Sequence, residues 1–303
     1  MASNSSLVVN TIPLSRPEWL PKSVWPFETF GLKLGDLVLA VTDVGRGPVL
    51  LFVHAGMWSF LWRDIISRLS ANFRCICFDV PGTGRSSSTT KSQVSLERAA
   101  HSVTGLIESL DLEKLTLVVH DLGGLAGLAG VTPIAGRVRG LVAMNTFGWK
   151  PVGNNFRGML ALMGSRVMRE IDVLSGFLPQ ITASNFGIGR HLDAASRRAF
   201  LAGMTTQGRR SFHDYVRDAR HCDTLYDRIA GLLRGSFNRF PLLTVFGELN
   251  DPFGFQQKWK ELFANTTQVV VPKGHHFPMC DAPELVTQKL HVWHRGNVGP
   301  LLH

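Results

Sequence analysis

The chain has 303 residues, 45% of them hydrophobic and 18% charged, which is typical of a globular protein with one large α/β domain or two smaller ones. No apolar stretch is long enough to span a bilayer, and the first residues do not show the basic and then apolar pattern of a signal peptide. The four cysteines include no CxxC pair. We therefore expect a soluble, cytoplasmic protein without a zinc site.

The first half of the chain predicts an arm, a hairpin and then alternating strands and helices. Residues 1–28 are rich in Ser, Pro and Trp without periodicity, and we expect them to form an N-terminal arm that lies on the domain. Residues 30–45 predict two antiparallel strands that turn at Gly35-Asp36. Further strands are expected at 48–54, 73–80, 115–121 and 137–145, with helices at 59–70, 95–110 and 123–136. This order indicates a mainly parallel sheet with helices on both faces.

Strand signals stop between Lys150 and about Arg239, and we predict a helical cap over residues 150–239. The net charge of the chain is +9, and residues 150–240 carry +7 of it, with fourteen Lys and Arg against seven Asp and Glu. A basic surface attracts anionic substrates, nucleic acid or an anionic membrane. No basic run or nucleic-acid-binding module accompanies the charge, so we interpret it as a solvated arginine-rich helical face.

Strands return at 241–247 and 267–272, and a helix is expected at 282–294. We therefore assign residues 29–149 and 240–303 to one α/β core, into which the cap is inserted between two strands. An insertion at that place lies over the carboxyl ends of the strands, where open α/β sheets bind ligands.

The sequence Val119-His120-Asp121-Leu122-Gly123-Gly124 carries the most specific signal. An apolar strand ends at Asp121, and a glycine-rich helix begins immediately after it. So tight a turn exposes the side chain at its apex and points the next backbone N–H at whatever binds there. This is the pattern of a nucleophile elbow with aspartate in place of serine, although a helix N-cap gives the same local sequence.

Two other residues also follow strands. His276 comes after the strand at 267–272, and Asp251 comes after the strand at 241–247. With Asp121, all three fall just past the carboxyl ends of strands, in the chain order nucleophile, acid, histidine. Glu248 lies closer to its strand end than Asp251 and is the alternative acid. Together the three residues favour catalysis over separate structural roles.

From Phe30 to Trp293 the chain resembles the α/β-hydrolase superfamily, and within it the haloalkane dehalogenase and epoxide hydrolase branch. The matching segments are HAGMWSFLWRD (54–64), DVPGTGRS (79–86), HDLGG (120–124), NTFGW (145–149), GHHF (274–277) and DAP (281–283). The resemblance implies an α/β-hydrolase fold with a mostly parallel sheet and a helical cap insertion. It also implies that Asp121 is the nucleophile, Asp251 the acid and His276, which directly precedes Phe277, the histidine.

Departures from this branch concern the substrate. Dehalogenases hold the leaving halide with a tryptophan immediately after the nucleophile, where this chain has Leu122, and many add an asparagine that the turn at 54–57 lacks. Epoxide hydrolases protonate the opening oxygen with tyrosines of the cap. Tyr215 and Tyr226 are the only tyrosines and both lie in the cap, although helix packing also accounts for them.

Further site residues follow from position and resemblance. The backbone N–H groups of Leu122 and of Gly56 or Met57 are expected to stabilise an oxyanion. The candidates for substrate binding are Trp58, Asn145, Trp149, Tyr215 and Tyr226.

A carboxylate is already charged at pH 7, so Asp121 suits attack on a saturated or epoxide carbon and gives a covalent ester. His276, oriented by Asp251, would then activate a water to hydrolyse that ester. We expect a hydrolase for small apolar substrates of epoxide, halide or ester type, with epoxides ahead of halides, and with no cofactor or metal. The alternatives are a cofactor-independent lyase or oxygenase, or a non-catalytic ligand receptor. We expect a monomer or homodimer with a small-molecule substrate and with neither nucleic acid nor a membrane as partner.

Overall fold

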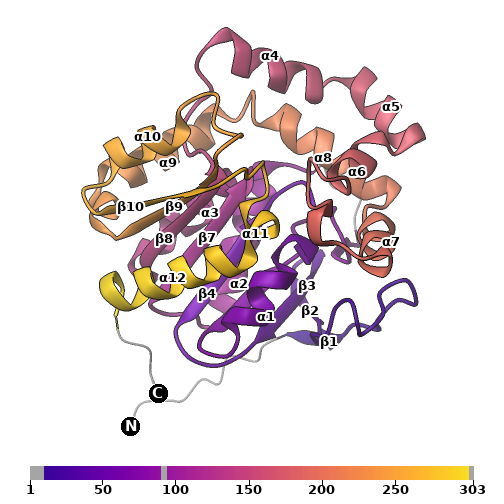
Figure 1. The fold of residues 1–303 in the computed structure, drawn as a ribbon, viewed down its shortest axis with the longest axis horizontal. Helices are drawn as coiled ribbons and strands as arrows, with labels where there is room; N and C mark the ends of the chain where they lie inside the picture. The colour runs from indigo at the N-terminus through magenta and orange to yellow at the C-terminus, as the bar shows by residue number, and fades with distance from the viewer. Residues whose placement is uncertain (1–9, 90–93, 300–303) are drawn as a thin grey trace.

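The computed structural model describes residues 10–89 and 94–299, and within these ranges ten strands form one sheet (Figure 1). The strands are β1 (Thr11–Pro13), β2 (Phe30–Leu34), β3 (Leu37–Val44), β4 (Val49–His54), β5 (Arg74–Phe78), β6 (Ser87–Ser88), β7 (Leu115–Asp121), β8 (Val138–Thr146), β9 (Leu242–Gly247) and β10 (Thr266–Val271). Their order is β1-β2-β3-β5-β4-β7-β8-β9-β10, and β6 pairs with β3.

The sheet confirms the predicted fold class. Strands β1, β2 and β3 pair antiparallel, and β3 also meets β5 antiparallel. From β5 to β10 every neighbouring pair is parallel. The predicted hairpin is confirmed, because Leu34 of β2 pairs with Leu37 of β3 and Gly35 adopts a positive φ of 60° in the turn. Strand β1 was not predicted, since three residues leave no detectable periodicity.

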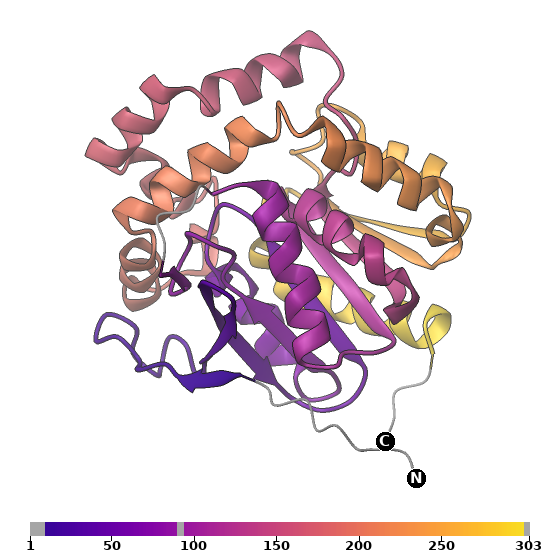
Figure 2. The same ribbon diagram turned by 180° about the vertical axis from the view of Figure 1, so that it is seen from behind.

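Helices cover both faces of this sheet (Figures 1 and 2). Those of the core are α1 (Arg63–Leu69), preceded by the 3-10 turn η1 (Ser59–Trp62), then α2 (Leu96–Ser109), α3 (Gly123–Val131), the 3-10 turn η2 (Thr132–Arg137), α10 (Phe255–Leu262), α11 (Pro278–Asp281) and α12 (Pro283–Asn297). Helix α1 packs on α12 on the face seen in Figure 1, and α2 packs on α3 on the face seen in Figure 2. The Ser95 side chain accepts a hydrogen bond from the Arg98 N–H and thereby caps the N-terminus of α2. No helix among the described residues is both long and apolar enough to cross a membrane.

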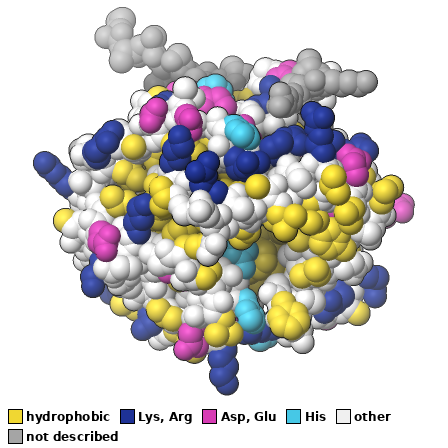
Figure 3. Space-filling model, turned by 90° about the horizontal axis from the view of Figure 1, so that it is seen from above, with side chains coloured by type: hydrophobic (Ala, Val, Ile, Leu, Met, Phe, Trp, Pro, Cys, Tyr) yellow, Lys and Arg dark blue, Asp and Glu magenta, His cyan; other side chains and the backbone are white. Residues whose placement is uncertain are grey.

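Residues 150–239, here called the cap, hold only helices in the described part of the chain. They are α4 (Asn154–Met163), α5 (Arg166–Ser175), α6 (Phe177–Thr182), η3 (Gly189–His191), α7 (Ala194–Gly203), α8 (Thr206–Asp218), α9 (Asp223–Arg234) and η4 (Ser236–Arg239). Figure 1 shows α4 and α5 above the core, and Figure 3 views the same face from above. Phe212 of α8 reaches the turn after β4, because a Cβ on Gly56 would lie 2.9 Å from its ring.

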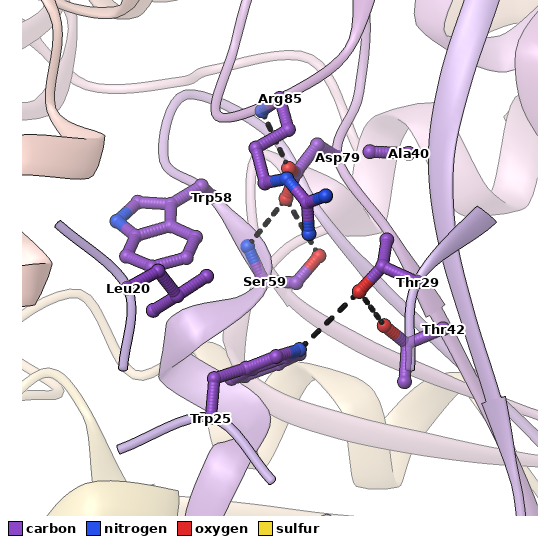
Figure 4. A pocket seen from close by; sticks show the side chains of 9 residues that line it. All are labelled: Leu20, Trp25, Thr29, Ala40, Thr42, Trp58, Ser59, Asp79 and Arg85. Atoms are coloured by element: carbon purple, nitrogen blue, oxygen red, sulfur yellow. Dashed lines mark hydrogen bonds between the residues drawn. The ribbon is translucent and has the colours of Figure 1, made fainter. Parts of the chain in front are cut away.

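The N-terminal arm packs against the turn after β4 through aromatic rings. Trp19 meets Trp58 edge to face with the ring centroids 5.5 Å apart. The ring centroids of Trp25 and Trp58, both drawn in Figure 4, lie 6.2 Å apart. Beside them the buried carboxylate of Asp79 accepts hydrogen bonds from the N–H and hydroxyl of Ser59, both at 2.7 Å, and from the Arg85 N–H at 2.8 Å. A cavity of only about 10 Å³ remains there, so this network is structural.

Candidate functional site

Asp121 lies at the apex of a strained turn. It ends β7 with a φ of 51°, a left-handed conformation that side chains rarely adopt. The Thr146 hydroxyl donates a 2.5 Å hydrogen bond to the Asp121 carbonyl and holds this conformation from the neighbouring strand β8. A Cβ at Gly123 or Gly124 would collide with the backbone of Val53 or the side chain of Thr146, so only glycine permits this close approach. These features fit a nucleophile elbow better than an ordinary helix N-cap.

His276 faces Asp121 across the end of the sheet. Its Nε2 lies 3.5 Å from Oδ2 of Asp121, and both side chains keep some contact with solvent. Burial raises the pKa of Asp121, but its interaction with the nearby His276, with smaller contributions from His54 and His120, lowers it to about 2. The carboxylate is therefore ionised throughout the physiological pH range, which is the state that a carboxylate nucleophile requires.

The other nitrogen of His276 meets Asn250 and not the predicted acid. Nδ2 of Asn250 lies 3.1 Å from Nδ1 of His276. Asp251 instead accepts hydrogen bonds from the N–H groups of Phe255 (2.7 Å) and Gln256 (3.0 Å), at the N-terminus of α10. The structure thus differs from the prediction by one residue, because Asp251 satisfies the free N–H groups of the helix that follows. The alternative acid is also engaged elsewhere, since Glu248 accepts a hydrogen bond from the Lys273 N–H at 2.7 Å.

Asn145 lies at the cavity, but its amide positions the His276 loop. Its Nδ2 donates to the carbonyls of His275 and His276 at 2.8 and 3.0 Å, and its Oδ1 accepts from the Gly247 N–H at 3.0 Å. Both ends of the amide are thus bonded to backbone, while Asn145 also lines the cavity, as expected of a residue that contacts substrate.

Two buried histidines underlie the site. Nε2 of His120 lies 2.7 Å from the carbonyl of His276, so this nitrogen carries the proton and Nδ1 is an acceptor. Nδ1 of His54 lies 3.0 Å from that acceptor and therefore donates to it. Burial lowers the pKa of His54 to about 4 and that of His120 well below its usual value, so both rings are neutral at pH 7. Sequence reasoning missed this pair, although each histidine ends or nearly ends a core strand.

A cavity of about 170 Å³ opens over Asp121. Its walls are mostly aromatic and apolar, and the lining residues are Asp121, Asn145, Phe147, Phe156, Met159, Phe246, Asn250, Asp251, Pro252, Phe253, Phe255 and His276. Phe156 and Met159 come from α4, so the cap forms one wall. This lining suits a small apolar substrate that is oriented by a few polar groups.

The residues expected to form the oxyanion site follow β4 and β7, which are neighbouring strands. Gly123 brings the start of α3 against the end of β4, because a Cβ on Gly123 would lie 2.2 Å from the Val53 carbonyl oxygen and 2.7 Å from Cα of His54. Within the described chain, the N–H groups of Leu122, Gly56 and Met57 donate no hydrogen bond to the protein. Free donors at this position agree with the expected role.

The other four predicted substrate contacts lie away from the cavity. Trp58 is buried and donates to the Phe200 carbonyl at 3.3 Å. Trp149 packs on Phe255 and Trp259. The hydroxyl groups of Tyr215 and Tyr226 are buried and donate at 2.7 Å to the carbonyls of Pro81 and Ala219. The structure therefore assigns these residues to packing, because helical spacing alone could not show which way their side chains point. No cluster of His, Cys, Asp or Glu suited to a metal ion occurs in the residues described.

Similarity to known proteins agrees with this geometry. Residues 50–288 match the Alpha/beta hydrolase family. The chain is 25% identical over 277 residues to haloalkane dehalogenase 2 of Mycobacterium tuberculosis, covering 87% of this chain and 93% of that protein. It is 32% identical over 261 residues to the cis-3-alkyl-4-alkyloxetan-2-one decarboxylase of Shewanella oneidensis, covering 78% of each. A thermophilic esterase from Thermogutta terrifontis shares the fold with a TM-score of 0.69 and 22% identity, over 86% of this chain and 94% of that chain.

Proposed function

The chain belongs to the alpha/beta hydrolase family, and we propose that it attacks small apolar electrophiles with the carboxylate of Asp121 and forms a covalent ester. It is an enzyme of the hydrolase type that acts on small substrates. The observation that carries the proposal is the 3.5 Å approach of His276 Nε2 to Asp121 Oδ2 at the head of an apolar cavity. The pKa of about 2 keeps the attacking oxygen anionic.

The first step forms a bond between an Asp121 oxygen and the electrophilic carbon, and the leaving group takes the bonding electrons. In the second step a water attacks the carboxyl carbon of Asp121 while His276 takes its proton at Nε2. The bond between that carbon and the ester oxygen that carries the substrate then breaks, the departing oxygen takes the proton back from His276 and leaves as an alcohol, and Asp121 is a carboxylate again. The N–H groups of Leu122 and Met57 would stabilise the oxyanion of this step. A flip of the Asn250 amide presents its carbonyl oxygen to Nδ1 of His276 and leaves Nε2 free to act as the base.

The test is intact-protein mass spectrometry of His276→Gln after incubation with epoxides, haloalkanes, esters and lactones. Because hydrolysis needs His276, we expect the variant to accumulate a mass increase equal to the transferred substrate portion. The control is His276→Gln combined with Asp121→Asn, which should show no adduct. An adduct that maps by peptide sequencing to another residue would disprove the assignment of Asp121.

A second candidate reaction is decarboxylation of a strained four-membered lactone, and Asn250 is the observation that favours it. A neutral amide at Nδ1 stabilises a histidine cation less than a carboxylate does, so water activation at Nε2 is weaker here. The Shewanella relative is named for an oxetan-2-one. Attack of Asp121 on the ring carbon that bears oxygen opens the ring to an ester and a free carboxylate. Loss of that carboxylate as CO2 supplies the electrons for a C=C bond and expels Asp121 unchanged.

Water labelled with heavy oxygen separates these two reactions. Hydrolysis transfers the oxygen of water to Asp121 and makes the enzyme heavier after several turnovers. Decarboxylation uses no water, leaves Asp121 unlabelled and releases an alkene and CO2. Both outcomes require Asp121, so an active Asp121→Asn variant would contradict both candidates.

A further inference from the structure

The cap exposes an unusual amount of apolar surface. Of the twelve large hydrophobic side chains that are exposed in the described residues, eight lie between residues 152 and 186. On α5, Val167, Ile171 and Leu174 are 71%, 49% and 87% exposed. They follow the i, i+4, i+7 pattern on the side opposite the buried Asp172 and Val173. The most solvent-exposed line of this helix is therefore apolar, the reverse of an ordinary surface helix.

This apolar stripe continues across α4 to the mouth of the cavity. Leu162 and Met159 of α4 are 59% and 44% exposed, and Met159 also lines the cavity over Asp121. Phe253, which precedes α10 in the core, is likewise partly exposed and lines the same cavity. An apolar molecule that lies along the stripe thus has a continuous apolar route into the site.

Basic side chains border the stripe. Arg157 of α4 lines a separate cavity of about 340 Å³ together with Lys150, Arg220 and His221. Among the described residues that line it, the single acid is Asp223, whose Oδ1 lies 2.8 Å from Nζ of Lys150. Arg157, Arg220 and the exposed Arg166 of α5 form no ion pair with the described residues. Figure 3 shows hydrophobic side chains gathered beside a group of Lys and Arg on this face.

We propose that this face of the cap docks on an anionic lipid surface. The stripe on α4 and α5 inserts among the acyl chains, and the basic cavity around Arg157 and Arg220 holds a lipid phosphate. Self-association through the same face is disfavoured, because two copies would bring Arg157 and Arg166 against like charges. A solvated basic face, as the sequence predicts, accounts for the arginines but not for the exposed apolar line of α5.

Docking of this kind needs no membrane-spanning segment, so it revises the expectation that a membrane takes no part. It also gives the cap a function beyond the proposed chemistry, since substrates dissolved in the bilayer would reach Asp121 past Met159 and Phe253. Binding itself requires no turnover. An Asp121→Asn variant should therefore bind vesicles as the wild type does, and failure of the proposed chemistry would leave this proposal intact.

The test is flotation with vesicles of phosphatidylcholine alone and with vesicles of phosphatidylcholine and phosphatidylglycerol in equal amounts. We expect the full chain to float only with the anionic vesicles and less as salt is raised. The double variant Val167→Ser with Leu174→Ser should bind roughly tenfold more weakly, because apolar area inserted in the bilayer is lost. Arg157→Gln and Arg220→Gln should each lose about fivefold.

Matched controls lie on other parts of the surface. Val292→Ser removes a similarly exposed valine from α12. Arg46→Gln removes an exposed arginine at the opposite end of the parallel strands. Neither substitution should change vesicle binding. Absence of flotation would overturn the proposal, as would an equal loss in the control variants. Sedimentation velocity distinguishes a further outcome. If the wild type is a dimer, the α5 double variant is a monomer and neither binds vesicles, the face joins two copies of this chain and the proposal is wrong.

Discussion

His54 and His120 share one hydrogen bond, with their Nδ1 atoms 3.0 Å apart, beneath the Asp121–His276 pair. Because Nε2 of His120 donates to the carbonyl of His276, His54 must supply the shared proton, and each ring is fixed in one neutral tautomer. Nε2 of His54 is buried with no partner among the described residues. A second proton on His54 would therefore place an unpaired charge in the core under the site.

The first prediction concerns stability in acid. Burial lowers the folded-state pKa of His54 from 6.5 to about 4, so between these values the unfolded chain binds the proton and the folded chain does not. The free energy of unfolding should accordingly rise as the pH increases from about 4 to 6.5, and His54 should contribute about 1.4 kcal/mol per pH unit. His54→Gln should remove the contribution of His54 to the pH dependence of the free energy of unfolding. The contributions of His120 and His294, whose pKa values are also lowered, should remain.

Denaturant unfolding at several pH values between those limits measures the slope. His101→Gln is the matched control, because His101 is 74% exposed and should leave the slope unchanged. If His54→Gln has the slope of the wild type, the shared proton and the neutral state of His54 are wrong.

The second prediction is that Asp121→Asn abolishes turnover and leaves the fold intact. Asparagine tolerates a φ of 51° better than alanine, for which left-handed backbone costs roughly 1–2 kcal/mol. An amide is a poor nucleophile, so we expect turnover to fall by at least about a thousandfold. The thermal midpoint of unfolding should stay close to that of the wild type.

Since the pKa of Asp121 is about 2, the rate of ester formation in the wild type should also stay unchanged as the pH is lowered to about 4. If the Asp121→Asn variant keeps more than a few per cent of wild-type turnover, the nucleophile lies elsewhere.

The third prediction separates Asn250 from Asp251. Asn250→Asp places a carboxylate against Nδ1 of His276, and we expect hydrolysis of the ester to speed up by about tenfold or more, because the histidine cation gains a partner. Asp251→Asn should lose about 1 kcal/mol of stability at the start of α10 and keep most of its activity. Single-turnover kinetics and thermal denaturation measure the two effects. An inactive, stable Asp251→Asn would restore Asp251 as the acid.

The sequence was informative where chemistry depends on strand ends. Strand β7 ends at Asp121, and β10 ends shortly before His276. Because parallel strands bring their carboxyl ends to one edge of the sheet, the closeness of Asp121 and His276 could be predicted from the sequence alone. The choice between Asn250 and Asp251 could not, because one residue of loop geometry decides which side chain reaches His276. Hydrophobic periodicity likewise locates the helices of the cap but not the direction of a single side chain such as Tyr215.

The fourth prediction follows from the buried tyrosines. Tyr215 and Tyr226 donate to backbone carbonyls, and burial raises the pKa of both phenols far above the usual value. Neither should therefore protonate an opening ring. Tyr215→Phe and Tyr226→Phe should each lose about 1 kcal/mol of stability through the missing hydrogen bond. Each should keep product formation from an aryl epoxide within about twofold. A selective loss of diol formation in either variant would show that its hydroxyl reaches the substrate.

The last prediction ranks the substrates, and it depends on what each leaving group requires. A halide must exchange its water shell for protein donors, and an unpaired charge in an apolar cavity costs several kcal/mol. Leu122 supplies no indole N–H, and the amide of Asn145 is already bonded to backbone. An opening epoxide develops charge on one oxygen and finds no tyrosine among the cavity residues. A strained lactone, or an ester attacked at its alkyl carbon, is less demanding, because the C–O bond that breaks releases a carboxylate, which spreads the negative charge over two oxygens. We therefore expect lactones and esters to react fastest, aryl epoxides next and terminal haloalkanes slowest, with about a hundredfold or more between the rates of the first and the last.

Parallel assays of acid or CO2, diol and halide release test this order of substrates, with Leu122→Trp as the matched variant. That substitution should raise halide release specifically, and rapid halide release by the wild type would show that another donor in this cavity already binds the halide.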